Sequence, residues 1–257
     1  LIYACIHHIY VTTPKTMKPA LLSSEDMLNP NIVDLWVVEQ FQEFRQQITH
    51  KNFPCFFATL SEQRGELRYT CVSDAQENLI LVEGLRSFVT LVSETTTHSR
   101  LAFIAFFKPE KEESSLKDYA EKFWKTLQFI HDHDEKEWAS NISPDPNNNN
   151  FEFCFEGKPI FVFGGAPAYI NRRSRNLCNS FLMIFVPYPS FHGVGVTTKE
   201  GIEARERIRK RLAKWDNFDV CEEFGDSNGQ PHAWKAYFIS DDSSPIFLQC
   251  PLKISSK

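Results

Sequence analysis

Two histidines in the middle of the chain, His131 and His133, are of the residue type that most often binds metals. His131 follows Leu127 by four residues and so extends the apolar stripe of a predicted helix, whereas His133 lies about 200° further round that helix. A buried neutral imidazole can coordinate iron through one nitrogen while the other donates a hydrogen bond. His131 is therefore a candidate axial ligand of a haem iron, and an ordinary hydrogen-bonded core histidine is the alternative.

The run from His131 to Asp134 also contains two carboxylates, which raises the alternative of a nonhaem metal site. Such a site needs ligands four residues apart on a helix or alternating along a strand, and neighbouring side chains on a helix diverge. We therefore favour one histidine ligand over a cluster of ligands.

A predicted strand at 151–155 places Glu152 and Cys154 on one face and Phe151 and Phe153 on the other, because strand side chains alternate. Glu152 can hold a cationic substrate and is our candidate catalytic residue. Cys154 is the alternative axial ligand, since a thiolate pushes electron density toward oxygen cleavage on haem iron.

A basic segment at 171–176 contains Arg172, Arg173 and Arg175. Guanidinium groups bind carboxylates through two parallel hydrogen bonds, so these arginines can hold haem propionates or an amino-acid substrate. The alternative is a solvated basic loop.

Helices and strands of ordinary length must position these residues. Apolar positions at helical spacing predict the helices, the clearest being 116–131, which Ser114 and Ser115 can cap. Runs of β-branched and aromatic residues predict the strands, with hairpins joining 53–60 to 66–73 and 151–155 to 159–163. The other expected helices are 31–48, 78–93 and 200–215, the last with Ile202, Ile208, Leu212 and Trp215 inward, and the other expected strands are 101–107, 180–186 and 234–239.

These elements predict an α+β fold, with a largely antiparallel or mixed central sheet flanked by helices in a single compact domain. We expect residues 1–30 to be an N-terminal extension and 31–257 to be the domain. The 23 phenylalanines among 257 residues predict a core of rigid rings, which can also hold a flat apolar ligand such as haem.

Charge and cysteine usage exclude several classes of partner. A net charge of −5 with only short basic runs argues against nucleic acid. The seven scattered cysteines form no C-x-x-C pair and are expected to be reduced. The apolar residues 1–10 are too few to span a membrane and lack a cationic start, so we expect a cytoplasmic protein with no membrane partner.

Several short motifs, in their order and spacing over roughly residues 53–242, resemble the YqcI/YcgG family. None is diagnostic alone, but the ordered set is fairly specific. The motifs are Phe53-Pro54-Cys55, Phe123-Trp124, Leu127-Gln128, His131-Asp132-His133-Asp134, Trp138, Pro144-Asp145-Pro146, Phe151-Glu152-Phe153-Cys154-Phe155, Gly157, Pro167-Ala168-Tyr169, Arg172-Arg173-Ser174-Arg175-Asn176, Arg207-Ile208-Arg209-Lys210-Arg211-Leu212, Asp216, Trp234-Lys235-Ala236-Tyr237-Phe238 and Asp241-Asp242.

The resemblance implies a haem b cofactor and N-oxygenation, that is N-hydroxylation, of a side-chain nitrogen in an arginine-like or lysine-like amino acid or a guanidine. The alternative is a noncatalytic haem-binding or sensing protein of the same fold. The electron donor or peroxide that would drive the reaction is not indicated, and a homodimer is left open.

Two positions depart from the pattern expected of this family. Val186-Pro187-Tyr188 stands where relatives are expected to carry Gln-Pro-Arg. Gly164-Gly165-Ala166 stands where they often have Asn-Cys-Asn. If either segment contacts haem or substrate, the substrate or the activity differs here.

Overall fold

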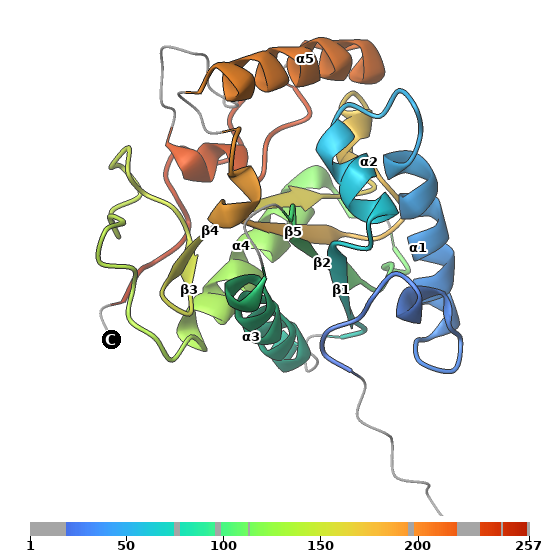
Figure 1. Cartoon of the computed structure of the whole chain (residues 1–257), viewed down its shortest axis with the longest axis horizontal. Helices are drawn as coiled ribbons and strands as arrows, with labels where there is room; N and C mark the ends of the chain where they lie inside the picture. Colours follow the sequence, from blue (N-terminus) through green and yellow to red (C-terminus); the bar gives the residue numbers. More distant parts are fainter. Residues whose placement is uncertain are drawn as a thin grey trace, which may run out of the picture.

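The computed structural model describes residues 19–74, 78–95, 99–112, 114–194, 198–219, 232–242 and 244–255. Its centre is a five-stranded sheet in the order β1-β2-β5-β4-β3 (Figure 1). The strands are β1 (Leu67–Val72), β2 (Ala102–Phe107), β3 (Cys154–Phe155), β4 (Lys158–Gly165) and β5 (Leu182–Pro187).

The sheet is mixed, as predicted. β1 and β2 are parallel, whereas β5 is antiparallel to both β2 and β4, and β3 is antiparallel to β4. The predicted β3–β4 hairpin is confirmed. Its turn residues Glu156 and Gly157 have φ of 52° and 68°, the left-handed conformation that a tight two-residue hairpin turn requires.

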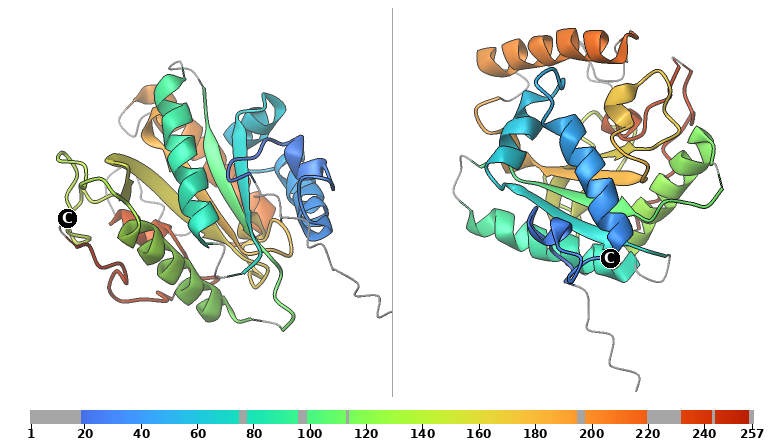
Figure 2. Two further views of the ribbon diagram at one scale, coloured as in Figure 1. Left: turned by 90° about the horizontal axis from the view of Figure 1, so that it is seen from below. Right: turned by 90° about the vertical axis from the view of Figure 1, so that its right-hand side faces the viewer.

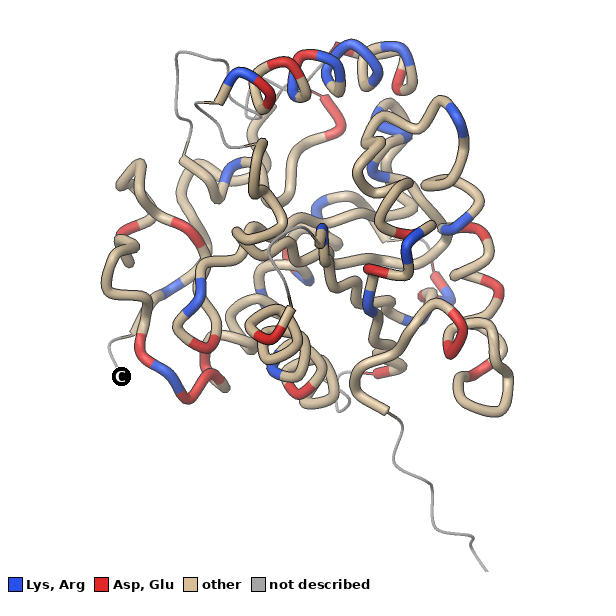
Figure 3. The backbone as a smooth tube through the Cα atoms, viewed as in Figure 1, with Lys and Arg blue, Asp and Glu red and all other residues tan. Residues whose placement is uncertain are grey.

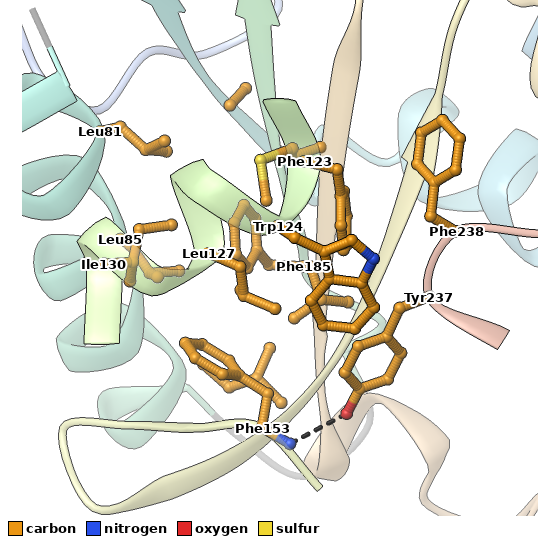
Figure 4. Packing of buried hydrophobic residues seen from close by; sticks show 14 of the residues in the cluster. Leu81, Leu85, Phe123, Trp124, Leu127, Ile130, Phe153, Phe185, Tyr237 and Phe238 are labelled. Carbon is orange, nitrogen blue, oxygen red and sulfur yellow. Dashed lines mark hydrogen bonds between the residues drawn. The ribbon is translucent and has the colours of Figure 1, made fainter. Parts of the chain in front are cut away.

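Helices α3 (Asn78–Glu94) and α4 (Leu116–Asp132) cover one face of the sheet, and α1 (Leu35–Ile48) and α2 (Phe56–Gln63) cover the other (Figure 2). α4 begins at a capping box, in which Ser115 and Asp118 each bind the other's backbone N–H. Aromatic rings from α4 and from the C-terminal region pack in the core between the sheet and helices α3 and α4 (Figure 4). Because α4 packs into this part of the core, His131 is held in place near the end of the helix.

Helix α5 (Lys199–Asp216) lies at one end of the molecule and contains both acidic and basic residues (Figure 3). The apolar residues expected to face inward are not buried: Ile202 is exposed, and Ile208, Leu212 and Trp215 are half-buried. α5 is therefore a peripheral helix. Its Trp215 ring packs against Phe53 and His50, and its Arg211 donates to the carbonyls of Lys51 and Phe53.

The strand expected at 53–60 was wrong, because residues 56–63 form α2. The rings of Phe56 and Phe57 suit a strand by propensity, but strand propensity depends strongly on context. In the helix, Thr59 donates to the Ile48 carbonyl, and Glu62 reaches both Arg45 and Tyr69. These long-range contacts decide the local structure.

The strand expected at 234–239 was also wrong. Residues Ala233–Ala236 form a short 3₁₀ helix, after which the chain crosses the end of β4. There the Tyr237 carbonyl accepts from the N–H of Gly164, and Phe238 lies against the space that a side chain at Gly164 would fill. A Cβ on Gly164 would come within 2.5 Å of the Phe238 ring, so glycine permits this crossing.

Part of the predicted N-terminal extension, and Cys5 and Cys221, lie outside the described residues. The five described cysteines are free thiols. Among the described helices, none has the length and apolar character needed to cross a membrane.

Candidate functional site

The structure places Glu152 in a cluster with two tyrosines that come from separate parts of the chain. The Tyr188 hydroxyl donates to Glu152 Oε1 at 2.6 Å, and the Tyr237 hydroxyl donates to Oε2 at 3.0 Å. Tyr237 oxygen in turn accepts from the N–H of Phe153 at 2.9 Å, as Figure 4 shows. Each carboxylate oxygen is thus fixed by one hydroxyl.

The predicted separation of Glu152 from Phe151 and Phe153 is confirmed, but Cys154, which was expected on the same face as Glu152, is buried like Phe155. Phe151 and Phe153 are fully buried in the core, whereas Glu152 is half-buried and Tyr188 is 43% exposed. Glu152 therefore keeps part of its surface open to solvent. Burial raises the pKa of the Glu152 carboxyl, while its two tyrosine bonds oppose that rise.

Glu62 provides a comparison within the same molecule. Its side chain is buried, accepts from the Tyr69 hydroxyl at 2.6 Å, and pairs with Arg45 at 2.9 Å. Glu152 likewise accepts from tyrosine, but no Lys, Arg or His forms an ion pair with it in the part of the chain that the structure describes. Within the described residues, Glu62 is therefore paired with a cation and Glu152 is not.

Cys154, the first residue of β3, is buried. Its Sγ lies 3.5 Å from the Glu152 carbonyl oxygen. Burial, together with the nearby Glu152 and Asp134 carboxylates, raises the pKa of the Cys154 thiol to about 12, so the free protein holds it as a thiol.

The prediction that His131, and not His133, faces the apolar side of the helix is confirmed by their burial. His131 is buried at the end of α4, with Trp138 edge-on to its ring, whereas His133 is exposed and stacks on Phe129. His131 Nε2 accepts from the backbone N–H of Ser255 at 3.2 Å. In the described residues, no three His, Cys, Asp or Glu side chains converge in a way that could hold a metal ion.

The donor chemistry of His131 suits a haem iron, which the resemblance implies. A nitrogen that accepts an N–H carries a lone pair, so Nε2 is the unprotonated nitrogen that a metal requires. That lone pair now faces Ser255, so iron could take it only if the chain at Ser255 moved. His131 carries a donor of the right type but is occupied by this hydrogen bond, and its role as the axial ligand stays a prediction.

Two of the three arginines in the basic segment hold backbone carbonyls. Arg172 donates to the carbonyls of Ser240 (2.7 Å) and Asp219 (3.0 Å), and Arg175 donates to that of Gly164 (3.0 Å). Both are buried, so the solvated-loop alternative does not describe them. Arg173 is exposed, with its guanidinium over the Trp215 ring. Binding of haem or substrate carboxylates by these arginines stays a prediction.

Asp241 explains why the basic segment keeps its shape. Its carboxylate accepts from three successive backbone N–H groups, those of Ile170, Asn171 and Arg172. Tyr169 also donates to the Ile239 carbonyl at 2.6 Å. The Pro-Ala-Tyr, Arg-Arg-Ser-Arg and Asp-Asp motifs therefore form one interlocked structural unit.

A cavity of about 440 Å³ lies between the end of α3, the start of β4 and the segment after β5. Its lining is largely apolar, with Lys158 as its one charged residue and Tyr188 at one side. Tyr188 thus belongs both to this cavity and to the Glu152 cluster. His131 is not among the lining residues.

Sequence reasoning missed Tyr188 and Tyr237 as partners of Glu152. Tyr188 was noted only as a departure from the family pattern, and Tyr237 only as a motif residue. Pairing of β4 with β5 places Pro187 opposite Ile160, and β3 pairs Cys154 with Pro159, so Tyr188 follows β5 close to the segment that carries Glu152. A sequence-based strand register would have been needed to find this contact.

The fold and the Glu152 cluster define an α+β protein with a mixed five-stranded sheet and a half-buried carboxylate site. The chain belongs to the YqcI/YcgG family, whose model matches residues 44–253. It is 30% identical over 224 residues to the protein YqcI of Bacillus subtilis, covering 84% of this chain and 87% of the relative. It is 31% identical over 205 residues to YcgG of the same organism, covering 77% and 80%. Both relatives are named as uncharacterized.

A third relative, from Streptomyces lavendulae, is named "Putative N(omega)-hydroxy-L-arginine synthase DcsA". It is 24% identical over 221 residues, which cover 84% of this chain and 83% of the relative. No solved structure matches this chain.

Proposed function

We propose that this protein is an N-oxygenase that uses bound haem to hydroxylate a side-chain nitrogen of an arginine-like or lysine-like amino acid or a guanidine. The observation that carries the proposal is the similarity, over most of both chains, to the relative named as an N(omega)-hydroxy-L-arginine synthase. The Glu152 carboxylate, which lacks an internal cation among the described residues, supports it, because the proposed substrates are cations.

His131 is the residue that would hold the haem iron, and Cys154 is the alternative. Haem, when bound, supplies the activation of oxygen, and the protein supplies binding and orientation. Arg173 is a candidate partner for a carboxylate of haem or substrate, since its guanidinium is exposed. With hydrogen peroxide as oxidant, one oxygen atom enters the N–H bond to give N–OH, and the other leaves as water.

A haem titration of the purified protein, followed by its absorption spectrum, tests the cofactor. We expect an intense Soret band that saturates near one equivalent of haem per chain. A titration that gives only the absorption spectrum of free haem would overturn the haem-dependent proposal. Haem binding with no turnover of any amine or guanidine would instead favour the noncatalytic haem-binding alternative.

A further inference from the structure

Tyr188 and Tyr237 bind the two oxygens of Glu152 from two directions. Tyr188 comes from the segment after β5, and Tyr237 from the chain that crosses the end of β4. Tyr237 is itself fixed, because it is fully buried, lies against Trp124 and Phe161, and accepts from a backbone N–H. The carboxylate therefore has a defined orientation before any ligand arrives.

An ionised carboxylate offers about four acceptor positions, two on each oxygen. The two hydroxyls use one position on each oxygen of Glu152. One position on each oxygen is then left. Two acceptors on adjacent oxygens match the two parallel N–H groups of a planar guanidinium better than the single charge centre of an ammonium.

The comparison with Glu62 indicates that the missing cation is external. A partly desolvated carboxylate without a partner is unfavourable, and Glu62 meets this requirement with Arg45. Glu152 has no such cation among the described residues, yet its side chain is held in place by two donors and is only half-buried.

We propose that Glu152 is a receptor for a planar cation on the substrate, and that Tyr188 and Tyr237 are positioning residues that set the orientation of its carboxylate. The inference rests on the proposed function for the identity of the ligand, an amino acid with a guanidinium side chain. It goes further in selecting guanidinium over ammonium and in giving the two tyrosines a role in that selection.

Isothermal titration calorimetry of the haem-loaded protein with L-arginine, L-lysine and L-citrulline tests the inference. Citrulline keeps the shape of arginine but has no side-chain charge. We expect the wild type to bind arginine more tightly than lysine or citrulline, and Glu152→Gln to lose about 10- to 100-fold in arginine affinity while citrulline is little affected. Equal arginine affinity in the wild type and in Glu152→Gln would overturn the receptor role.

Tyr188→Phe tests the positioning role without disturbing the core, because Tyr188 is partly exposed. It should lower arginine affinity several-fold and narrow the preference for arginine over lysine. Tyr169→Phe is the matched control: it removes a buried hydroxyl bond to the backbone carbonyl of Ile239 and leaves both hydroxyls on Glu152 in place, so it should lower stability but leave that preference intact. If Tyr169→Phe and Tyr188→Phe change the preference equally, the tyrosine role is wrong.

Measuring arginine binding and product formation separately distinguishes the receptor role of Glu152 from the proposed enzyme function. Glu152-dependent arginine binding without any hydroxylated product would retain the receptor and contradict the enzyme proposal. Hydroxylated product together with unchanged arginine binding by Glu152→Gln would support the enzyme proposal and contradict the receptor role of Glu152. A wild-type protein that binds none of the three amino acids would overturn the receptor.

Discussion

His131 Nε2 and the backbone N–H of Ser255 form a hydrogen bond across 124 residues of sequence. The bond is part of a seam between α4 and the C-terminal segment, in which the Gln128 side chain binds both the N–H and the carbonyl of Lys253. The same histidine lone pair that a haem iron would use is thus tied to the end of the described chain.

Substitution of His131 separates its structural role from its proposed role as a ligand. We expect His131→Ala to change the ligand-field bands of the haem-loaded protein, with partial restoration by added imidazole. His133→Ala is the matched control and should leave the bands unchanged, since His133 is exposed and stacks on Phe129. A spectral change in Cys154→Ala but not in His131→Ala would assign the iron to Cys154.

The basic segment should contribute to stability through Arg172 and much less through Arg173. Arg172→Ala removes one buried and one partly buried bond to a carbonyl, so we expect a loss of about 3 kcal/mol in the free energy of unfolding. Arg173→Ala removes an exposed contact with Trp215 and should cost about 0.5–1 kcal/mol. Urea denaturation of both variants measures the difference, and equal losses would contradict this division.

Gly164 should tolerate no side chain while Phe238 keeps its position. Gly164→Ala places a Cβ within 2.5 Å of the Phe238 ring, so we expect a loss of about 1–3 kcal/mol from overpacking. In the double variant with Phe238→Leu, the two losses should be less than additive, because the smaller side chain relieves the clash. Additive losses of stability in the double-mutant cycle would show that the Phe238 ring is not what excludes a side chain at position 164.

Asp216 should make the protein less stable as pH rises. Burial raises the pKa of Asp216, although bonds from Ser174 oppose the rise. Between the unfolded pKa near 3.8 and the higher folded pKa, the folded state binds more protons, so stability falls as pH increases through this window. Relative to Asp216→Asn, the wild type should lose stability over that range and then level off. If the wild type instead gained stability relative to Asp216→Asn as pH rises, the pKa of Asp216 would be lowered in the folded state.

Much of the fold could be predicted because strong local patterns and tertiary packing agree. The stripe of α4 ends in His131, and the Glu156-Gly157 turn joins two apolar strands, so periodicity and turn chemistry determine both elements. Residues 56–63 and 234–239 were misassigned, because contacts with distant residues override strand propensity there.

The candidate site was only partly predictable for a related reason. Alternation along a strand correctly separated Glu152 from Phe151 and Phe153. However, the tyrosines that hold Glu152 lie 36 and 85 residues away in sequence. No local spacing relates them, and only the sheet register and the crossing at the end of β4 bring them together.

Product analysis tests the central proposal most directly. The haem-loaded protein is incubated with L-arginine and, separately, L-lysine, with hydrogen peroxide or with oxygen and a reductant, and the products are identified by mass spectrometry. We predict a haem-dependent product that is heavier than its substrate by one oxygen atom, located on a side-chain nitrogen. Absence of that product from both substrates under both conditions, in protein that has bound haem, would contradict the proposed N-oxygenase function.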